Sequence, residues 1–436
     1  MKTSHPQTKL MGSLVALAVL MAACAAPATP APAAPTPAPA AEATIAPTEA
    51  AVAATEAAPA EPTAEATVAT TEAMTATAEM TSTMAMTATE AMTETAATGE
   101  LKPVTLQLQW VAQSQFAGYF AAVDMGFYKA EGLDVTIKEG AVDIVPQQVV
   151  ASGAADFGVA WLPKVLVSRE EGAKLINIGQ VFQRSGTLEV SWKDSNLTKV
   201  EDWKGKKIGT WGFGNEHELF AAMRKAGIDP DNADDVTIVQ QPFDMSLLLN
   251  REVDAAQAMI YNEYAQVLEA VNPATGKLYQ PEDLNVINFN DVGTAMLQDG
   301  IFVTEEWLAT PGNEEVAVKF LKATFKGWIY CRDNFDACVE IVLAKGSTLG
   351  TSHQAWQLNE INALIWPSPG GIGVMDTALY EQTATVSADQ KVTKAKAGPE
   401  AYRSDLAEKA LAELSSEDTK GESFKKTTVV LVEGGQ

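Results

Sequence analysis

A glycine-rich loop with two aromatic residues is the first candidate for a binding site. In the stretch GTWGFGNE, at 209–216, Trp211 and Phe213 alternate with glycines. A helix that starts behind such a loop exposes backbone N–H groups, which favour partial negative charge in a ligand. Glu216 and Glu218 already place negative charge in the first helical turn, and no Gly-Lys-Ser/Thr follows. We therefore do not expect a nucleotide phosphate site.

The loop suits an uncharged aromatic heterocycle instead. Trp211 and Phe213 offer flat apolar faces, and Asn215, Glu216 and the loop amides can hydrogen-bond heteroatoms at the edge of a ring. The alternative is that both rings belong to the core of their domain. The sequence leaves this choice open.

Residues of the same kind follow strands in the first half of the chain. A predicted strand at 104–110 ends at Trp110, and Gln115 and Phe116 come in the next turn. Trp161 directly follows a second strand, 156–160. The carboxyl ends of strands are where α/β sheets bind ligands, so we expect these side chains at one cleft. Tyr119, three residues past Phe116, is as much a core candidate as a contact.

A further aromatic and amide pair, Tyr261 and Asn262, follows a strand predicted at 255–260. These candidate loops contain Gln, Asn, Trp and Glu but no arginine. A receptor for an anion such as a sulfonate would need Arg, Lys or several unopposed amides. The loops therefore favour a small neutral or weakly basic aromatic heterocycle as the partner.

Catalytic chemistry is not indicated. His217 stands at a helix start beside Glu216, where a solvated or capping role is usual, and no nucleophile–base pair is evident. The chain has three histidines, none spaced with a cysteine for zinc, so we expect neither a metal nor a cofactor. Cys331 and Cys338 flank Asp333 and Asn334, which favour a break between helices; the two cysteines are either a disulfide or two buried thiols.

Strand and helix patterns alternate from 101 onward, which predicts βαβ units and a largely parallel sheet. The pattern restarts at 205, so two α/β units lie in series and join near 182–188. After a strand-like run at 296–303 the chain is mainly helical, and we expect this part to pack on the first unit. The chain would then cross between two lobes twice, with a ligand cleft between them.

The N-terminal part has a different composition. Two lysines precede an apolar run at 14–21, which ends in small residues before Cys24. This predicts a signal peptide at 1–23 with lipidation of Cys24, or else an ordinary secretory signal cut near Ala26. The stretch 24–100 is rich in Ala, Thr, Pro and Glu, and we expect a disordered tether. The formal charge of −25 argues against nucleic acid as a partner.

Four sequence blocks carry a resemblance to a known family. They are FAGYFAA at 116–122, GFYKAEGL at 126–133, SGAADFG at 152–158 and KGKKIG at 204–209. In this order they resemble the solute-binding proteins of ABC importers, in the branch that includes thiamine-pyrimidine, alkanesulfonate and nitrate binders. The blocks span roughly 101–270, and the remaining chain resembles the family only in being helical.

The resemblance implies a periplasmic-binding-protein type 2 fold. Lobe 1 would comprise 101–187 and 296–436, and lobe 2 would comprise 188–295. It also implies a monomeric receptor on the extracytoplasmic face of the membrane that serves an ABC permease. LQLQW at 106–110 and WGFGNE at 211–216 look most like pyrimidine and flavin binders. Riboflavin is therefore the first expected ligand; a thiamine-precursor pyrimidine or an alkanesulfonate- or nitrate-type anion is the alternative.

Overall fold

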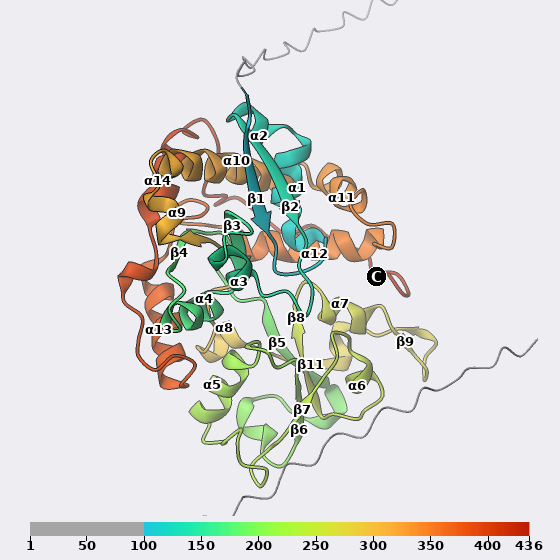
Figure 1. Cartoon of the computed structure of the whole chain (residues 1–436). Helices are drawn as coiled ribbons and strands as arrows, with labels where there is room; N and C mark the ends of the chain where they lie inside the picture. The colour runs from blue at the N-terminus through green and yellow to red at the C-terminus, as the bar shows by residue number, and fades with distance from the viewer. Residues whose placement is uncertain (1–99, 436) are drawn as a thin grey trace, which may run out of the picture. The chain divides into compact units, whose positions relative to one another are not determined.

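The computed structural model describes residues 100–435, which contain two five-stranded mixed sheets (Figure 1). The first sheet has the order β2-β1-β3-β12-β4. Its strands are β1 (Lys102–Gln107), β2 (Leu133–Lys138), β3 (Phe157–Ala160), β4 (Leu175–Gln180) and β12 (Gly300–Thr304). β1 pairs in parallel with β2 and β3, whereas β12 runs antiparallel between β3 and β4. We call this sheet and the helices packed on it lobe 1.

The second sheet has the order β11-β5-β8-β6-β7 and forms lobe 2 with its helices. Its strands are β5 (Thr187–Trp192), β6 (Lys207–Thr210), β7 (Thr237–Gln240), β8 (Ala255–Met259) and β11 (Leu284–Asn288). β6 is parallel to β7 and β8, but β5 is antiparallel to β8 and β11. The prediction of a largely parallel sheet is confirmed for four strands of each sheet, which run in one direction. The exceptions are β5 and β12, the strands that follow the two crossovers, and each runs antiparallel to its neighbours.

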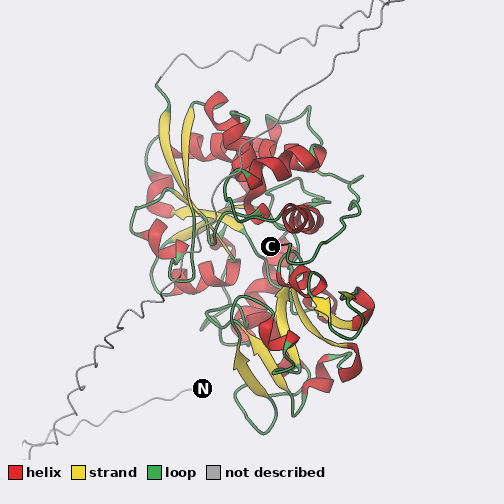
Figure 2. Cartoon of the chain, turned by 90° about the vertical axis from the view of Figure 1, so that its right-hand side faces the viewer, coloured by secondary structure: helices red, strands yellow, loops and turns green. Residues whose placement is uncertain are grey.

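Helices flank the strands of both sheets (Figure 2). Lobe 1 carries α1 (Ala117–Asp124), α2 (Phe127–Ala130), α3 (Pro146–Ala151), α4 (Leu162–Glu170), α9 (Glu305–Ala309), α10 (Asn313–Asp333), α11 (Phe335–Leu343), α12 (Thr351–Ile365), α13 (Thr377–Asp389) and α14 (Ser404–Ala412). Lobe 2 carries α5 (His217–Lys225), α6 (Ser246–Leu249), α7 (Glu263–Leu268) and α8 (Phe289–Val292).

Short elements complete the described chain. They are a hairpin of β9 (Val271–Asn272) and β10 (Lys277–Leu278) and the 3-10 turns η1 (Ser114–Phe116), η2 (Lys193–Ser195), η3 (Val200–Trp203), η4 (Pro281–Asp283) and η5 (Pro399–Ala401). Within residues 100–435 no helix is both long and apolar enough to cross a bilayer. The predicted signal peptide, Cys24 and the tether up to 99 lie outside the described residues.

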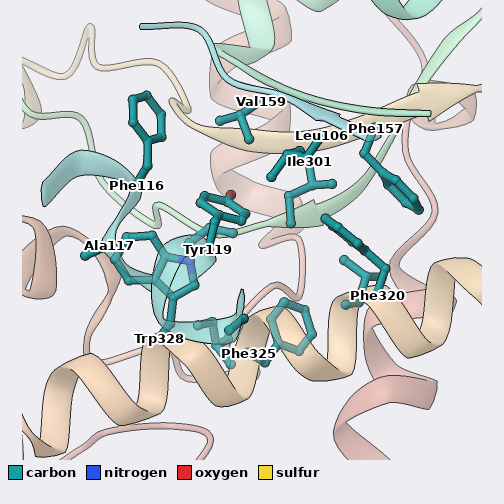
Figure 3. Close-up of a cluster of buried hydrophobic side chains, with 14 of the residues drawn as sticks. Leu106, Phe116, Ala117, Tyr119, Phe157, Val159, Ile301, Phe320, Phe325 and Trp328 are labelled. Atoms are coloured by element: carbon teal, nitrogen blue, oxygen red, sulfur yellow. The ribbon is translucent and has the colours of Figure 1, made fainter. Parts of the chain in front are cut away.

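The C-terminal helices of lobe 1 pack on its N-terminal part. α10 lies against α1, and Gly327 approaches so closely that a Cβ there would lie 2.0 Å from the Gly118 carbonyl oxygen. The rings of Phe157 and Phe320 stack with centroids 4.0 Å apart (Figure 3). One apolar core therefore joins segments far apart in the sequence. At the end of α10 a disulfide joins Cys331 to Cys338 in α11, across the break between the two helices.

The two crossovers, 181–186 and 293–299, are bonded to each other and to lobe 2. The Glu218 carboxylate of α5 accepts the Met296 N–H at 2.6 Å and the Ser185 hydroxyl at 2.8 Å, one from each crossover. Gln298 donates to Thr187 and accepts from Gly186. Burial raises the pKa of Glu218 to about 7. A single carboxylate thus ties both connecting segments to one helix.

Candidate functional site

A cavity of about 460 Å³ lies between the two lobes. Lobe 1 lines it with the chain after β1, the segment 141–148, and the start of α4. Lobe 2 lines it with the loop after β6 and the residues that follow β8. In both lobes these segments follow the carboxyl ends of strands, which is where α/β sheets place ligand sites. The sheets therefore position the candidate residues predicted from sequence at one place.

Aromatic side chains from both lobes form the walls of the cavity. Trp110 and Phe243 come from different lobes, and their ring centroids lie 4.9 Å apart. Trp211 lies nearly parallel to Phe243, at an interplanar angle of 8° and a centroid distance of 6.2 Å. Trp161 and Tyr261 also line the cavity. Trp110 and Phe243 are already in contact across the lobes, so a flat ring can stack on the faces of these aromatic side chains that this contact leaves free.

A buried carboxylate organises the lobe 1 side of the cavity. Asp299, in the second crossover, accepts the side-chain amide of Gln109 at 2.5 Å and that of Gln115 at 2.8 Å. Trp161 also hydrogen-bonds this carboxylate. All three partners line the cavity. Burial raises the pKa of Asp299 to about 6, and these hydrogen bonds oppose the rise, so the carboxylate is ionised at neutral pH and fixes three lining side chains.

A cation also lines the cavity. The Lys164 amine of α4 donates to Asn215 Oδ1 at 2.9 Å and thereby links lobe 1 to the loop of lobe 2. It stands 5.0 Å from the ring centroid of Trp161. Burial lowers the pKa of Lys164 to about 8, although Glu216 and Asp299 oppose the change. From sequence, we considered cations only in the candidate loops, whereas Lys164 is in the helix that follows one of them.

Amides on the lobe 2 side are fixed by residues of α12. Asn262 Oδ1 accepts from Gln357 Nε2 at 3.0 Å and lies 2.8 Å from His353 Nε2. The other nitrogen of His353 lies 3.1 Å from the Glu269 carboxylate. Glu263 is buried and accepts the Asn262 side-chain amide at 2.8 Å. This network crosses between the lobes beside the cavity and orients Asn262.

The structure brings most of the residues predicted from sequence to this cavity. The lining includes Trp110, Gln115, Trp161, Trp211, Phe213, Asn215, Tyr261 and Asn262. Trp211 is almost completely buried, at 3% exposure, whereas Phe213 is 70% exposed at the rim and has a positive φ of 55°. A positive φ is unusual for a bulky residue and indicates that the loop imposes this conformation. Whether these side chains contact a ligand stays a prediction.

Three predicted residues lie elsewhere. Phe116 and Tyr119 are buried in the lobe 1 core, where Tyr119 packs edge-on against Trp328 (Figure 3). The reason is that α10 covers α1 and Tyr119 faces that helix, while Phe116 is enclosed in the same core. Glu216 does not line the cavity either; its carboxylate turns back and accepts the Gly214 N–H at 3.0 Å.

Sequence reasoning missed four residues of the site: Gln109, Lys164, Phe243 and Asp299. Lys164 could have been found, because it stands three residues after Trp161 at the start of the predicted helix. Asp299 was hidden inside the strand expected at 296–303, whereas β12 begins only at Gly300. Its φ of 38° shows that the chain turns there. Phe243 follows β7 and has no sequence signal that separates it from a core residue.

Proteins with similar sequences bind or make small heterocycles, according to their names. The riboflavin-binding protein RibY of Chloroflexus aurantiacus is 27% identical over 65% of this chain and 79% of its own length. The formylaminopyrimidine-binding protein of Halalkalibacterium halodurans is 22% identical over 56% of this chain and 70% of its own. A putative thiamine biosynthesis protein of Haemophilus influenzae is 28% identical over 43% of this chain and 60% of its own.

Solved structures with this fold include a putative sulfonate-binding protein SsuA from Methylobacillus flagellatus, with a TM-score of 0.55 and 17% identity over 76% of this chain and 99% of that one. SsuA of Escherichia coli gives a TM-score of 0.52 at 14% identity over 77% and 95%. These likenesses show the periplasmic-binding-protein fold, with two α/β lobes and a cleft between them. The sequence profile described as "NMT1/THI5 like" matches residues 113–337, more than half of the 436 residues, so the chain belongs to the NMT1/THI5-like family.

Proposed function

We propose that this protein is an extracytoplasmic solute-binding receptor of an ABC importer and that its ligand is riboflavin. The two lobes close on the ring by bending at the two crossovers, and the permease recognises the closed form. The proposal includes a lipid anchor at Cys24, a tether at 24–100, a monomeric receptor, and lobe boundaries at 101–187, 188–295 and 296–436. The disulfide between Cys331 and Cys338 fits an oxidising compartment outside the cytoplasm.

The observation that carries the proposal is the pair of aromatic walls that face one cavity from different lobes. Trp110 and Trp161 come from lobe 1, and Trp211 and Phe243 from lobe 2. A volume of about 460 Å³ lies within the range of roughly 300–1,000 Å³ that small-molecule sites occupy. Closure around a flat ring would bury it between these walls, and the amides of Gln115 and Asn262 stand beside them.

The similarity to RibY supports riboflavin, and the similarity to the formylaminopyrimidine-binding protein supports a thiamine-precursor pyrimidine as the second candidate. An aminopyrimidine is also flat and would stack on the same walls. Lys164 supplies a charge that an alkanesulfonate could use, so this third ligand belongs in the test. Some relatives are named as pyrimidine phosphate synthases. We propose binding without turnover for this chain.

Fluorescence titration of the purified protein tests the proposal. Binding of riboflavin should quench both the intrinsic tryptophan emission and the emission of the flavin, because the ring stacks on indoles. A thiamine-precursor pyrimidine and an alkanesulfonate should bind more weakly in parallel titrations. Binding of the sulfonate alone would refute the role of the aromatic walls. Recovery of a chemically altered ligand after incubation would refute binding without turnover.

A further inference from the structure

The amine of Lys164 can donate more hydrogen bonds than the residues around the cavity accept. Lys164 belongs to the first turn of α4, and its side chain reaches across to Asn215 Oδ1 of lobe 2. A protonated amine has three N–H donors. Asn215 is the one residue within 100–435 that accepts a hydrogen bond from this amine. Two N–H donors therefore remain for a ligand that enters the cavity.

The protonation state follows from the surroundings of the amine. Burial lowers the pKa of Lys164 to about 8, which leaves most of the amine protonated at neutral pH. Glu216 and Asp299 are the carboxylates that stabilise its charge, and His217 is the titratable group of lobe 2 beside it. Burial and Lys164 both lower the pKa of His217 from its ordinary value of 6.5, so this ring is neutral above pH 7.

A second donor of the cavity also lacks a partner. Trp211 lines the cavity at 3% exposure, and its indole Nε1 has no hydrogen-bond acceptor within the described chain. An indole N–H can only donate, and an unpaired buried donor is unfavourable until an acceptor reaches it. By contrast, both carboxylate oxygens of the lining residue Glu263 already accept, one from the Met259 backbone and one from the side chain of Asn262. Lys164 and Trp211 thus offer free donors to acceptor atoms of a ligand.

We propose that Lys164, assisted by Trp211, sets the ligand class: it selects aromatic rings whose edge carries carbonyl oxygens and disfavours basic rings that carry a proton. This inference rests on the proposed function. The dione edge of a flavin presents two carbonyl oxygens to the donors. An aminopyrimidine presents an amino donor and a basic ring nitrogen, and its protonated form is repelled by the charge of Lys164.

Two substitutions at Lys164 separate charge from packing. Lys164→Met keeps the length and apolar contacts of the side chain, and Lys164→Arg keeps the charge. Riboflavin and lumiflavin, which has the same ring edge with a methyl group in place of the ribityl chain, should each bind Lys164→Met about 10- to 100-fold more weakly, the usual effect of losing a charged hydrogen-bond donor. Lys164→Arg should bind both more tightly than Lys164→Met. The matched control is Lys129→Met, an exposed position in α2, which should bind as the wild type does.

The pH profile distinguishes a charged contact from a structural one. Riboflavin should bind the wild type more weakly as the pH rises through 8, because Lys164 loses its proton there. Asp299 is already ionised and His217 already neutral in this range. Lys164→Met should lack this step, and any titration of the flavin itself cancels in the comparison.

Three outcomes would contradict the assignment. Equal riboflavin affinity of wild type and Lys164→Met would overturn the role of Lys164 but leave the proposed function intact. Tighter binding of 4-amino-5-hydroxymethyl-2-methylpyrimidine than of riboflavin by the wild type would overturn the selection of a carbonyl edge. Failure of the wild type to bind any flavin would overturn the proposed function itself. Thermal unfolding of each variant verifies that it is folded.

Discussion

The substitution Asp299→Asn should separate ligand binding from stability. The ordinary pKa of an aspartate is 3.8, and burial raises the pKa of Asp299 to about 6. This difference corresponds to about 3 kcal/mol, by which ionised Asp299 destabilises the folded state at pH 7 relative to acid pH. A neutral asparagine avoids this cost. The pKa of about 6 already includes the hydrogen bonds from Gln109 and Gln115, so they are not subtracted again. Asparagine instead places an NH2 group where a carboxylate oxygen accepted, and a buried donor without a partner costs about 1–3 kcal/mol.

These opposing effects are of similar size, so the free energy of unfolding at pH 7 should change by no more than about 2 kcal/mol. Binding should respond more strongly. The side chains of Gln109, Gln115 and Trp161 donate hydrogen bonds to the two carboxylate oxygens of Asp299. Asparagine has one side-chain oxygen, so at least one of these three hydrogen bonds must be lost. We expect riboflavin affinity to fall about tenfold, which corresponds to about 1.4 kcal/mol.

Urea unfolding and flavin titration of the same preparations provide the test. Below about pH 4, Asp299 is protonated in both the folded and the unfolded state. The free energies of unfolding of wild type and Asp299→Asn should then differ only by the effects of packing and hydrogen bonding. The control is Asp291→Asn, an exposed acid of α8. A loss of several kcal/mol of stability with unchanged riboflavin affinity would refute the reasoning, since Asp299 would then serve the fold and not the cavity.

Three further outcomes follow from the contacts described. Burial raises the pKa of Glu218 from 4.5 to about 7, so its stabilising contribution is complete below pH 4.5 and is lost as the pH rises through 7. Glu218→Gln should remove about 2.5 kcal/mol of the difference in unfolding free energy between pH 5 and pH 8, measured with urea. Identical pH profiles of wild type and variant would contradict the buried position of Glu218 between the crossovers. Trp211→Phe removes an indole N–H that has no hydrogen-bond partner in residues 100–435. The melting temperature should therefore stay within a few degrees of that of the wild type, whereas riboflavin affinity should fall severalfold. Unchanged affinity would show that no ligand atom accepts a hydrogen bond from this donor. Replacing Cys331 and Cys338 together by serine should lower the free energy of unfolding by about 2–3 kcal/mol, measured with urea, and leave riboflavin affinity unchanged. An altered affinity would mean that the junction of α10 and α11 affects the cavity.

Local patterns in the sequence determined the strand–loop–helix units and the loops that carry Trp110, Trp161, Trp211 and Tyr261. These features are predictable because alternating apolar residues, glycine and capping residues act over a few positions. The position of a residue directly after a strand also implies its place at the edge of the sheet. The aromatic and amide character of the site was therefore predictable before any tertiary contact was known.

Only the tertiary structure decided which of those residues face the cavity. Phe116 and Tyr119 are aromatic like the lining residues, but both are enclosed in the lobe 1 core, where Tyr119 packs against Trp328 of α10, some 200 positions later. The tertiary structure likewise decides that β5 and β12 run antiparallel to their neighbours, because each strand enters its sheet from a crossover. Asp299 acquires its role from Gln109, Gln115 and Trp161 of lobe 1, and Lys164 acquires its role from Asn215 of lobe 2. Burial and charge pairing depend on segments that periodicity does not relate.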